Sequence, residues 1–147
     1  MNSRNWFKLA KSIGLTITAA TLILSMSSCG KKIKFLSSSV VPAATGFVKI
    51  SRDGNDNYLI NVHITNLAES KQLQPGRKAY IVWLVADNTI TKNIGQIQSS
   101  NSFLSKTLRA NFKTVSSFMP TRVFLTAEDD VSVQFPTSEV VLTTPEF

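Results

Sequence analysis

The sequence predicts an all-β domain, and three features support that prediction. Residues 79–86 (AYIVWLVA) form the longest apolar run after residue 28 and are rich in β-branched and aromatic side chains. A run of this length between turn residues is typical of a buried central strand. Residues 58–67 alternate apolar and polar side chains, which indicates a half-buried antiparallel strand. Turn residues recur roughly every 8–15 residues, so we expect an immunoglobulin-like antiparallel β-sandwich of about seven strands.

The chain begins with a segment that has the features of a helical bacterial signal peptide, residues 1–28. Residues 1–11 are positively charged, and residues 13–26 are mainly apolar. A helix of that apolar length spans about 21 Å, which is short of the roughly 30 Å hydrocarbon core of a membrane. We therefore expect a cleaved export signal rather than a permanent transmembrane helix.

The only cysteine follows this segment, and its surroundings resemble the lipobox of bacterial lipoproteins. Small residues precede it in the sequence LSMSSCG (residues 24–30), with Met26 where that family more often has Leu. The resemblance implies that the chain is cut before Cys29 and that the Cys29 sulfur carries a diacylglycerol. Acyl chains contribute about 0.8 kcal/mol per buried methylene, so such an anchor would be stable. The alternative is a lone cysteine in an ordinary secreted or anchored protein.

Residues 29–45 are predicted to form a flexible tether between the anchor and the domain. They contain Lys31, Lys32 and Lys34, a run of serines and Pro42, with little periodicity. Two interpretations of the lysines are open. They belong to a solvated linker, or they are attracted to anionic headgroups, which contributes about 1 kcal/mol per charge near a membrane surface.

Residues 46–147 make up the predicted β-sandwich domain. Its strands are expected at residues 46–51, 58–67, 79–86, 89–98, 103–108, 121–128 and 139–143. Residues 112–118 are expected to run irregularly. Gly95, inside its strand, indicates a β-bulge or a close backbone approach.

The expected core of the domain centres on residues 79–86. The side chains that we expect in it are Tyr80, Trp83, Leu84, Val123 and Leu125. Trp83 corresponds in this prediction to the tryptophan on strand C of immunoglobulin-like domains. Residues 79–86 are apolar on both faces, whereas a two-layer sandwich buries only one face of each sheet. A loop is the expected cover for the second face, with a neighbouring chain or a partner as the alternatives.

The charge of the chain lies mainly in its first 34 residues. The formal net charge is +7, but from Ala43 onward ten Lys or Arg stand against nine Asp or Glu, a balance of +1. The basic residues of the domain are scattered singly along its strands, so we do not expect nucleic-acid binding, which needs clustered Lys and Arg. One cysteine and one histidine exclude an intrachain disulfide and a Cys/His zinc cluster.

The sequence contains no catalytic constellation, and we expect no enzyme activity, cofactor or metal. A Ser/His/Asp triad would have to use His63, which lies on the polar face of its strand, and no nucleophile elbow is present. Residues 53–57 begin like a calcium loop but lack the Gly and Glu that such a loop needs, so we expect a turn. Residues 128–130 (EDD) form the only acidic cluster. We expect a solvated loop there, with a divalent-cation site as the alternative if Asp53 or Asp56 lies nearby.

Ordered features between residues 75 and 143 resemble the extracytoplasmic C-terminal domain of the anti-sigma-K factor family. The segments that carry the resemblance are AYIVWLVAD (79–87), NIGQI (93–97), VFLTAE (123–128) and PTSEVVL (136–142). The family-motif residues of this chain are Gly95, Glu128, Pro136 and Thr137. The resemblance implies an outer domain that family members carry behind one transmembrane helix and a cytoplasmic sigma-binding module. The sequence has a lipoprotein-like leader in place of both, so we do not expect this chain to hold a sigma factor itself.

Together these features predict a lipid-anchored lipoprotein of the bacterial cell envelope that faces the periplasm or the cell surface. We expect a binding or structural role there, with the membrane and another envelope protein as partners and no nucleic acid. The alternative, which the family resemblance implies, is an accessory or sensory component of an envelope-stress regulatory system.

Overall fold

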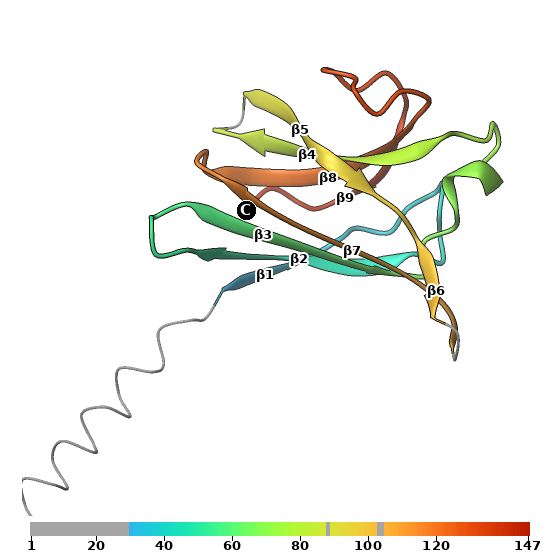
Figure 1. Cartoon of the computed structure of the whole chain (residues 1–147), viewed down its shortest axis with the longest axis horizontal. Coiled ribbons are helices and arrows are strands. Elements are labelled where there is room, and N and C mark those ends of the chain that lie inside the picture. Colours follow the sequence, from blue (N-terminus) through green and yellow to red (C-terminus); the bar gives the residue numbers. More distant parts are fainter. Residues whose placement is uncertain (1–29, 88, 103–104) are drawn as a thin grey trace, which may run out of the picture.

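The computed structural model describes residues 30–87, 89–102 and 105–147 (Figure 1). The predicted signal peptide and Cys29 lie outside the described residues. Within the described part of the chain, no helix is long and apolar enough to cross a membrane. The helical structure found there is a single 3₁₀ turn, η1 (Ser70–Gln72).

Nine strands in the described residues form two antiparallel sheets that pack face to face (Figure 1). Their bounds are β1 Lys31–Lys34, β2 Thr45–Arg52, β3 Tyr58–Thr65, β4 Ala79–Ala86, β5 Ile90–Ile97, β6 Ser100–Ser102, β7 Ser105–Ser116, β8 Pro120–Glu128 and β9 Val140–Thr143. The five-stranded sheet has the order β1-β2-β3-β7-β6, and the four-stranded sheet has the order β5-β4-β8-β9.

The strand order confirms the predicted immunoglobulin-like antiparallel β-sandwich. In that fold one sheet has the order A-B-E-D, and the other holds C, F and G, with C′ beside C in some members. If β2 to β9 are lettered A, B, C, C′, D, E, F and G along the chain, β2-β3-β7-β6 corresponds to A-B-E-D and β5-β4-β8-β9 corresponds to C′-C-F-G. The chain crosses between the sheets after β3, β5 and β7, which gives a Greek-key connection.

The structure differs from the predicted strands at β7, which continues to Ser116 through a stretch where the sequence predicts an irregular run. Ala110 and Phe112 pack toward the core, and Asn111 and Lys113, which alternate with them, are exposed. The strand is a regular one, but small Ala110 on its inner face weakens the apolar alternation that a sequence pattern depends on.

Residues 31–45 also differ from the predicted flexible tether. β1 pairs with β2 along its whole length, and Ile33 is buried between the sheets. Further along, Val41 joins the same core, and the Leu36 amide donates to the Thr143 carbonyl at 2.8 Å. The segment is therefore part of the sandwich. The sequence concealed it because three lysines surround the single buried side chain of β1.

The core between the two sheets contains four of the five predicted core residues. Tyr80, Leu84, Val123 and Leu125 are each at most 1% exposed. All buried members of this core lie between Ile33 and Leu142. In the described part of the chain, the buried core of the sandwich thus extends from β1 to β9.

Trp83, the fifth predicted core residue, is fully buried but faces the opposite way. It belongs to a second apolar cluster on the outer face of the four-stranded sheet, together with Ala79, Ile81, Val85 and Phe124. Its ring stacks on Phe124 with the ring centroids 6.2 Å apart. The correspondence with the strand-C tryptophan is therefore wrong, because the alternation of β4 directs Tyr80, Val82 and Leu84 into the core instead. Val133 packs against this second cluster, so the expected cover by a loop is confirmed.

Candidate functional site

Glu128, at the end of β8, is a buried carboxylate that collects hydrogen bonds from three hydroxyl groups and two backbone amides. Its side chain accepts from the Thr126 hydroxyl at 2.7 Å, the Ser138 hydroxyl at 3.1 Å and the Thr137 hydroxyl. The amides of Thr137 and Ser138 donate to the same carboxylate. Two residues of the family motif, Glu128 and Thr137, therefore meet in space, while Pro136 beside them is exposed.

The Glu128 carboxylate is connected to Trp83 through Thr126. The Trp83 indole nitrogen donates to the Thr126 hydroxyl at 2.8 Å, and that hydroxyl donates onward to Glu128. Burial disfavours the charged form of Glu128, but the hydrogen bonds from Thr126, Thr137 and Ser138 outweigh it and hold the pKa of this carboxyl below its usual value. An ionised Glu128 thus fixes the start and end of residues 129–139, the loop that covers Trp83.

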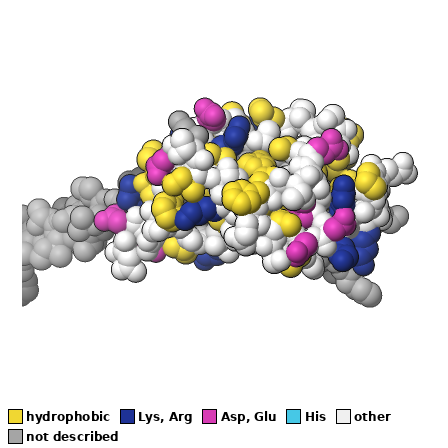
Figure 2. Space-filling model, turned by 90° about the horizontal axis from the view of Figure 1, so that it is seen from above, with side chains coloured by type: hydrophobic (Ala, Val, Ile, Leu, Met, Phe, Trp, Pro, Cys, Tyr) yellow, Lys and Arg dark blue, Asp and Glu magenta, His cyan; other side chains and the backbone are white. Residues whose placement is uncertain are grey.

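We call residues 129–139 the covering loop. Besides the Glu128 bonds, the Asn93 side-chain amide donates to the carbonyls of Val131 and Val133 at 3.1 and 2.9 Å. Figure 2 shows this side of the molecule, with hydrophobic side chains across its middle and charged side chains of both signs around them. Val131 and Phe135 of the loop are 48% and 73% exposed, and Val140, which follows the loop on β9, is 48% exposed. The cover is therefore itself partly apolar on the outside.

Gly95, the remaining family-motif residue, lies at a β-bulge, as predicted. The pairing of β4 with β5 shifts register between Val82 and Trp83, and Gly95 has a φ of +139°. A Cβ at this position would lie 2.7 Å from a ring carbon of Phe112 on the opposite sheet. Gly95 thus permits a close approach of the two sheets, and its backbone amide donates to the Asn93 side-chain oxygen at 3.0 Å, which helps to hold the bulge.

The acidic residues after β8 do not converge. Asp129 forms an ion pair with Arg77 at 2.6 Å, and Asp130 accepts from the amide and hydroxyl of Ser132, with the amide chiefly lowering the Asp130 pKa. In the residues that the structure describes, no group of three or more His, Cys, Asp or Glu could hold a metal ion.

Residues 53–57 form a hairpin turn between β2 and β3. The Asp53 carboxylate accepts from the amides of Asn55 and Asn57 at 2.8 and 2.9 Å, and these bonds lower the Asp53 pKa. The carboxylate thus holds the turn together, as the sequence pattern predicts.

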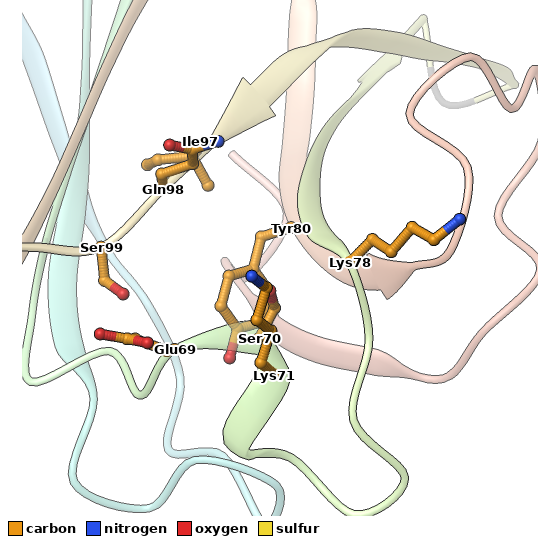
Figure 3. Close-up of a pocket in the computed structure, with 8 residues that line it drawn as sticks. All are labelled: Glu69, Ser70, Lys71, Lys78, Tyr80, Ile97, Gln98 and Ser99. Atoms are coloured by element: carbon orange, nitrogen blue, oxygen red, sulfur yellow. The ribbon is translucent and has the colours of Figure 1, made fainter.

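A polar pocket of about 320 Å³ lies beside Tyr80, between η1 and the end of β5 (Figure 3). The Tyr80 hydroxyl donates to the Ala68 carbonyl at 2.9 Å, and burial raises the pKa of Tyr80 to about 12. Figure 3 shows Lys78 pointing away from Glu69 and Ser99, so the charged groups around the pocket do not meet at one point. The arrangement offers a neutral, already bonded phenol rather than an acid–base pair.

The outer face of the five-stranded sheet carries the most distinctive arrangement of charge. The register of β1, β2, β3 and β7 aligns Lys32, Lys49, Asn61 and Lys113 in one row across the four strands. All three lysines of this row are exposed, because their neighbours Ile33, Val48, Ile50, Ile60 and Val62 face the core.

A second row lies beside the first and consists of Lys34, Phe47, His63 and Asn111. Lys32 reaches across to the Phe47 ring, with its Nζ 3.7 Å from the ring centroid. The Phe47 and His63 rings lie 5.0 Å apart, and His63 Nδ1 is 2.7 Å from the Asn111 side-chain oxygen. His63 is exposed on the polar face of β3, as predicted.

We call this surface the basic face. Its cations are Lys32, Lys34, Lys49, Arg109 and Lys113. Among the outward side chains that the structure describes on β1, β2, β3 and β7, none is an Asp or Glu. A depression of about 440 Å³ opens on this face, and Lys32, Lys34, Phe47 and His63 are among the residues that line it.

Sequence reasoning missed the basic face because its members are far apart in the chain. The signal was present nevertheless: the positions of Lys32 and Lys34 differ by two, and those of Arg109 and Lys113 differ by four. In a strand such spacing puts side chains on one side. What the sequence could not supply was the pairing of β1 with β2 and of β3 with β7.

Comparisons with protein families, characterised proteins and solved structures found no match to this chain. The resemblance to the anti-sigma-K factor family therefore stays a prediction from the quoted segments.

Proposed function

We propose that this protein is a lipid-anchored lipoprotein of the bacterial cell envelope, held by Cys29 and facing the periplasm or cell surface, with a binding role toward another envelope component. The observation that supports it is the position of β1, which begins at Lys31, two residues after the cysteine. Two extended residues span about 7 Å at most. An acylated Cys29 would therefore hold the sandwich directly at the headgroups, without a spacer.

The covering loop is the part of this anchored body that is best placed for a partner. β1 belongs to the five-stranded sheet, whereas the covering loop lies on the far side of the four-stranded sheet (Figure 1). Phe135, 73% exposed, is the most exposed large apolar side chain that the structure describes, and Val131 and Val140 are near it in the chain. Exposed apolar side chains that gather on one side are typical of protein interaction sites.

The anchoring part of the proposal is tested by Cys29→Ser in the full chain. We expect the wild-type protein to sediment with membranes and its mature amino terminus to show the mass of a diacylated or triacylated cysteine. The Cys29→Ser variant should lose that mass and leave the lipid fraction. An unmodified, uncut amino terminus in the wild type would overturn the proposal.

The binding part is tested by photo-crosslinking in intact cells. A photoreactive residue at Phe135 should give an adduct of defined mass, whereas the same residue at Asn55, in the turn between β2 and β3, should give none. Equal adducts at both positions, or none at Phe135, would contradict a partner at the covering loop.

The second candidate is an accessory or sensory component of an envelope-stress regulatory system. The observation that favours it is local: Glu128 and Thr137, two residues of the family motif, form one hydrogen-bonded group. Deletion of the gene should then change the transcription of an envelope-stress regulon. An unchanged transcriptome would remove this candidate.

A further inference from the structure

We propose that the basic face binds anionic phospholipid headgroups, so that the sandwich lies with its five-stranded sheet against the membrane that carries the anchor. The inference rests on the proposed function for the membrane in question. The binding of the face to anionic lipid is a separate property, which can be measured on protein without the lipid anchor.

Charge on the basic face has no internal counterpart. Lys32 and Lys49 are direct partners across β1 and β2, and Lys113 continues the same row. Like charges directly opposite each other in a sheet are destabilising. In the described part of the four strands no outward carboxylate offsets them. The ion pair of Arg52 with Asp56 lies at the β2–β3 turn, and that of Arg77 involves Asp129 after β8. Such a surface is complementary to an external anion.

The shape of the basic face suits a layer of headgroups. Neighbouring strands lie about 4.8 Å apart, so the two rows extend roughly 14 Å over four strands. The cations are therefore spread over a broad sheet surface rather than gathered at one point. The depression beside Lys32, Lys34 and His63 would admit a single phosphate group, while Lys49, Arg109 and Lys113 would contact neighbouring headgroups.

The anchor is what favours a membrane over other polyanions. Lys32 and Lys34 lie on β1, within five residues of Cys29, and the basic face extends from this strand. A lipid on Cys29 would keep the face within a few ångströms of headgroups at a high effective concentration. Because the formal net charge from Ala43 onward is only +1, we expect little general attraction to a polyanion beyond this face.

The test uses residues 30–147, which contain all nine described strands of the sandwich, with large unilamellar vesicles. One set contains phosphatidylethanolamine and phosphatidylglycerol, and the other contains phosphatidylcholine alone. We expect partitioning onto the phosphatidylglycerol vesicles that weakens as salt is raised from 50 to 300 mM, because headgroup attraction is screened. Equal partitioning onto both sets would overturn the proposal.

Matched variants assign the binding to the face. One triple variant removes three charges from the basic face: Lys32→Gln, Lys49→Gln and Lys113→Gln. At about fivefold per charge, its affinity for the vesicles should fall about 100-fold. The control removes three charges elsewhere, with Lys71→Gln, Lys78→Gln and Lys92→Gln, and should stay within about threefold of wild type. The melting temperature of each variant shows whether it is folded. The single Lys113→Gln change should still lower the affinity for the vesicles about fivefold. Equal losses in the two triple variants would contradict the assignment.

Two further probes separate the lipid from other anions. Inorganic phosphate at 10 mM should leave vesicle binding largely unchanged, since the face contacts several headgroups at once. A 20-base-pair DNA duplex should bind more weakly than the vesicles at equal charge and salt. Full competition by phosphate, or tighter binding to the duplex, would overturn a lipid surface as the occupant. If the Cys29→Ser variant still sediments with membranes while the vesicle result holds, the proposed lipid anchor is wrong. The proposed lipid binding by the basic face is then retained.

Discussion

The two outer faces of the sandwich are built from the same alternating strand geometry, but one is exposed to solvent and the other is covered by a loop. On the five-stranded sheet, most described outward positions of β1, β2, β3 and β7 carry lysine, arginine or polar side chains, with Phe47, Leu59 and Val115 among them, and no described loop comparable to the covering loop covers this face. On the four-stranded sheet, the outward positions of β4 carry Ile81, Trp83 and Val85, and the covering loop shields them. A strand that is apolar on both faces needs a third layer, and the covering loop supplies it.

The comparison also shows how each face is held in place. The covered face depends on one ionised carboxylate, because Glu128 binds Thr126 beneath the loop and Thr137 and Ser138 within it. The basic face has no such centre. Its side chains interact in pairs, such as Lys32 with Phe47 and His63 with Asn111, and each pair is exposed to solvent. Single substitutions should therefore be costly on the covered face and mild on the basic face.

The largest expected effect is at Trp83. Trp83→Ala should lower the free energy of unfolding by about 3–5 kcal/mol, because a fully buried aromatic side chain and its bond to Thr126 are lost. Urea denaturation followed by far-ultraviolet circular dichroism measures it. The matched change on the basic face is Phe47→Ala, which should cost less than about 1.5 kcal/mol, since Phe47 is only half-buried. A loss below about 1 kcal/mol at Trp83 would mean that its face is not a core.

Glu128→Ala should lower the free energy of unfolding by about 2–3 kcal/mol, because five donors lose their acceptor. The covering loop should also become the first site of cleavage by a nonspecific protease. Glu139→Ala, at an exposed carboxylate of the same loop, is the control and should change stability by less than about 0.5 kcal/mol. Equal effects of the two changes would show that Glu128 does not fix the loop.

The stability of the domain should fall in acid, in part through Glu128. The folded protein holds the Glu128 pKa below its ordinary value of about 4.5, so the unfolded chain binds the proton more readily in that range. The contribution is complete above about pH 4.5 and is lost as the pH falls through the folded pKa. Melting temperatures between pH 6 and pH 3 should show this slope, and Glu128→Gln should reduce it. Some slope should remain, since the Asp53 and Asp130 pKa values are also lowered.

The smallest expected effect is a gain in stability on the basic face. Lys49→Glu replaces a like-charge pair with Lys32 by an opposite-charge pair and should stabilise the domain by about 0.5 kcal/mol at low salt. Urea denaturation at 20 mM and 300 mM salt measures it, and the gain should shrink at the higher salt. A destabilised Lys49→Glu domain would show that the row of lysines carries no electrostatic cost.

Much of the fold follows from local patterns in the sequence. The apolar run 79–86 coincides with β4, and the alternation from Tyr58 coincides with β3, because both patterns depend only on which side chains prefer burial. Gly95 marks a bulge for a similar local reason, since its positive φ suits a residue without a Cβ. β1 escaped prediction because four residues with one buried side chain are too few for a pattern.

The sequence by itself determined the all-β class, the central strand and the burial of Trp83, since these depend on composition and periodicity within single segments. Only the tertiary structure decided which face of β4 meets the other sheet, which donors surround Glu128 and which lysines share a surface. Each of those outcomes depends on strand register and loop path, which bring together residues up to about 80 positions apart, such as Lys32 and Lys113. No single segment contains that information, because the contacts form between segments.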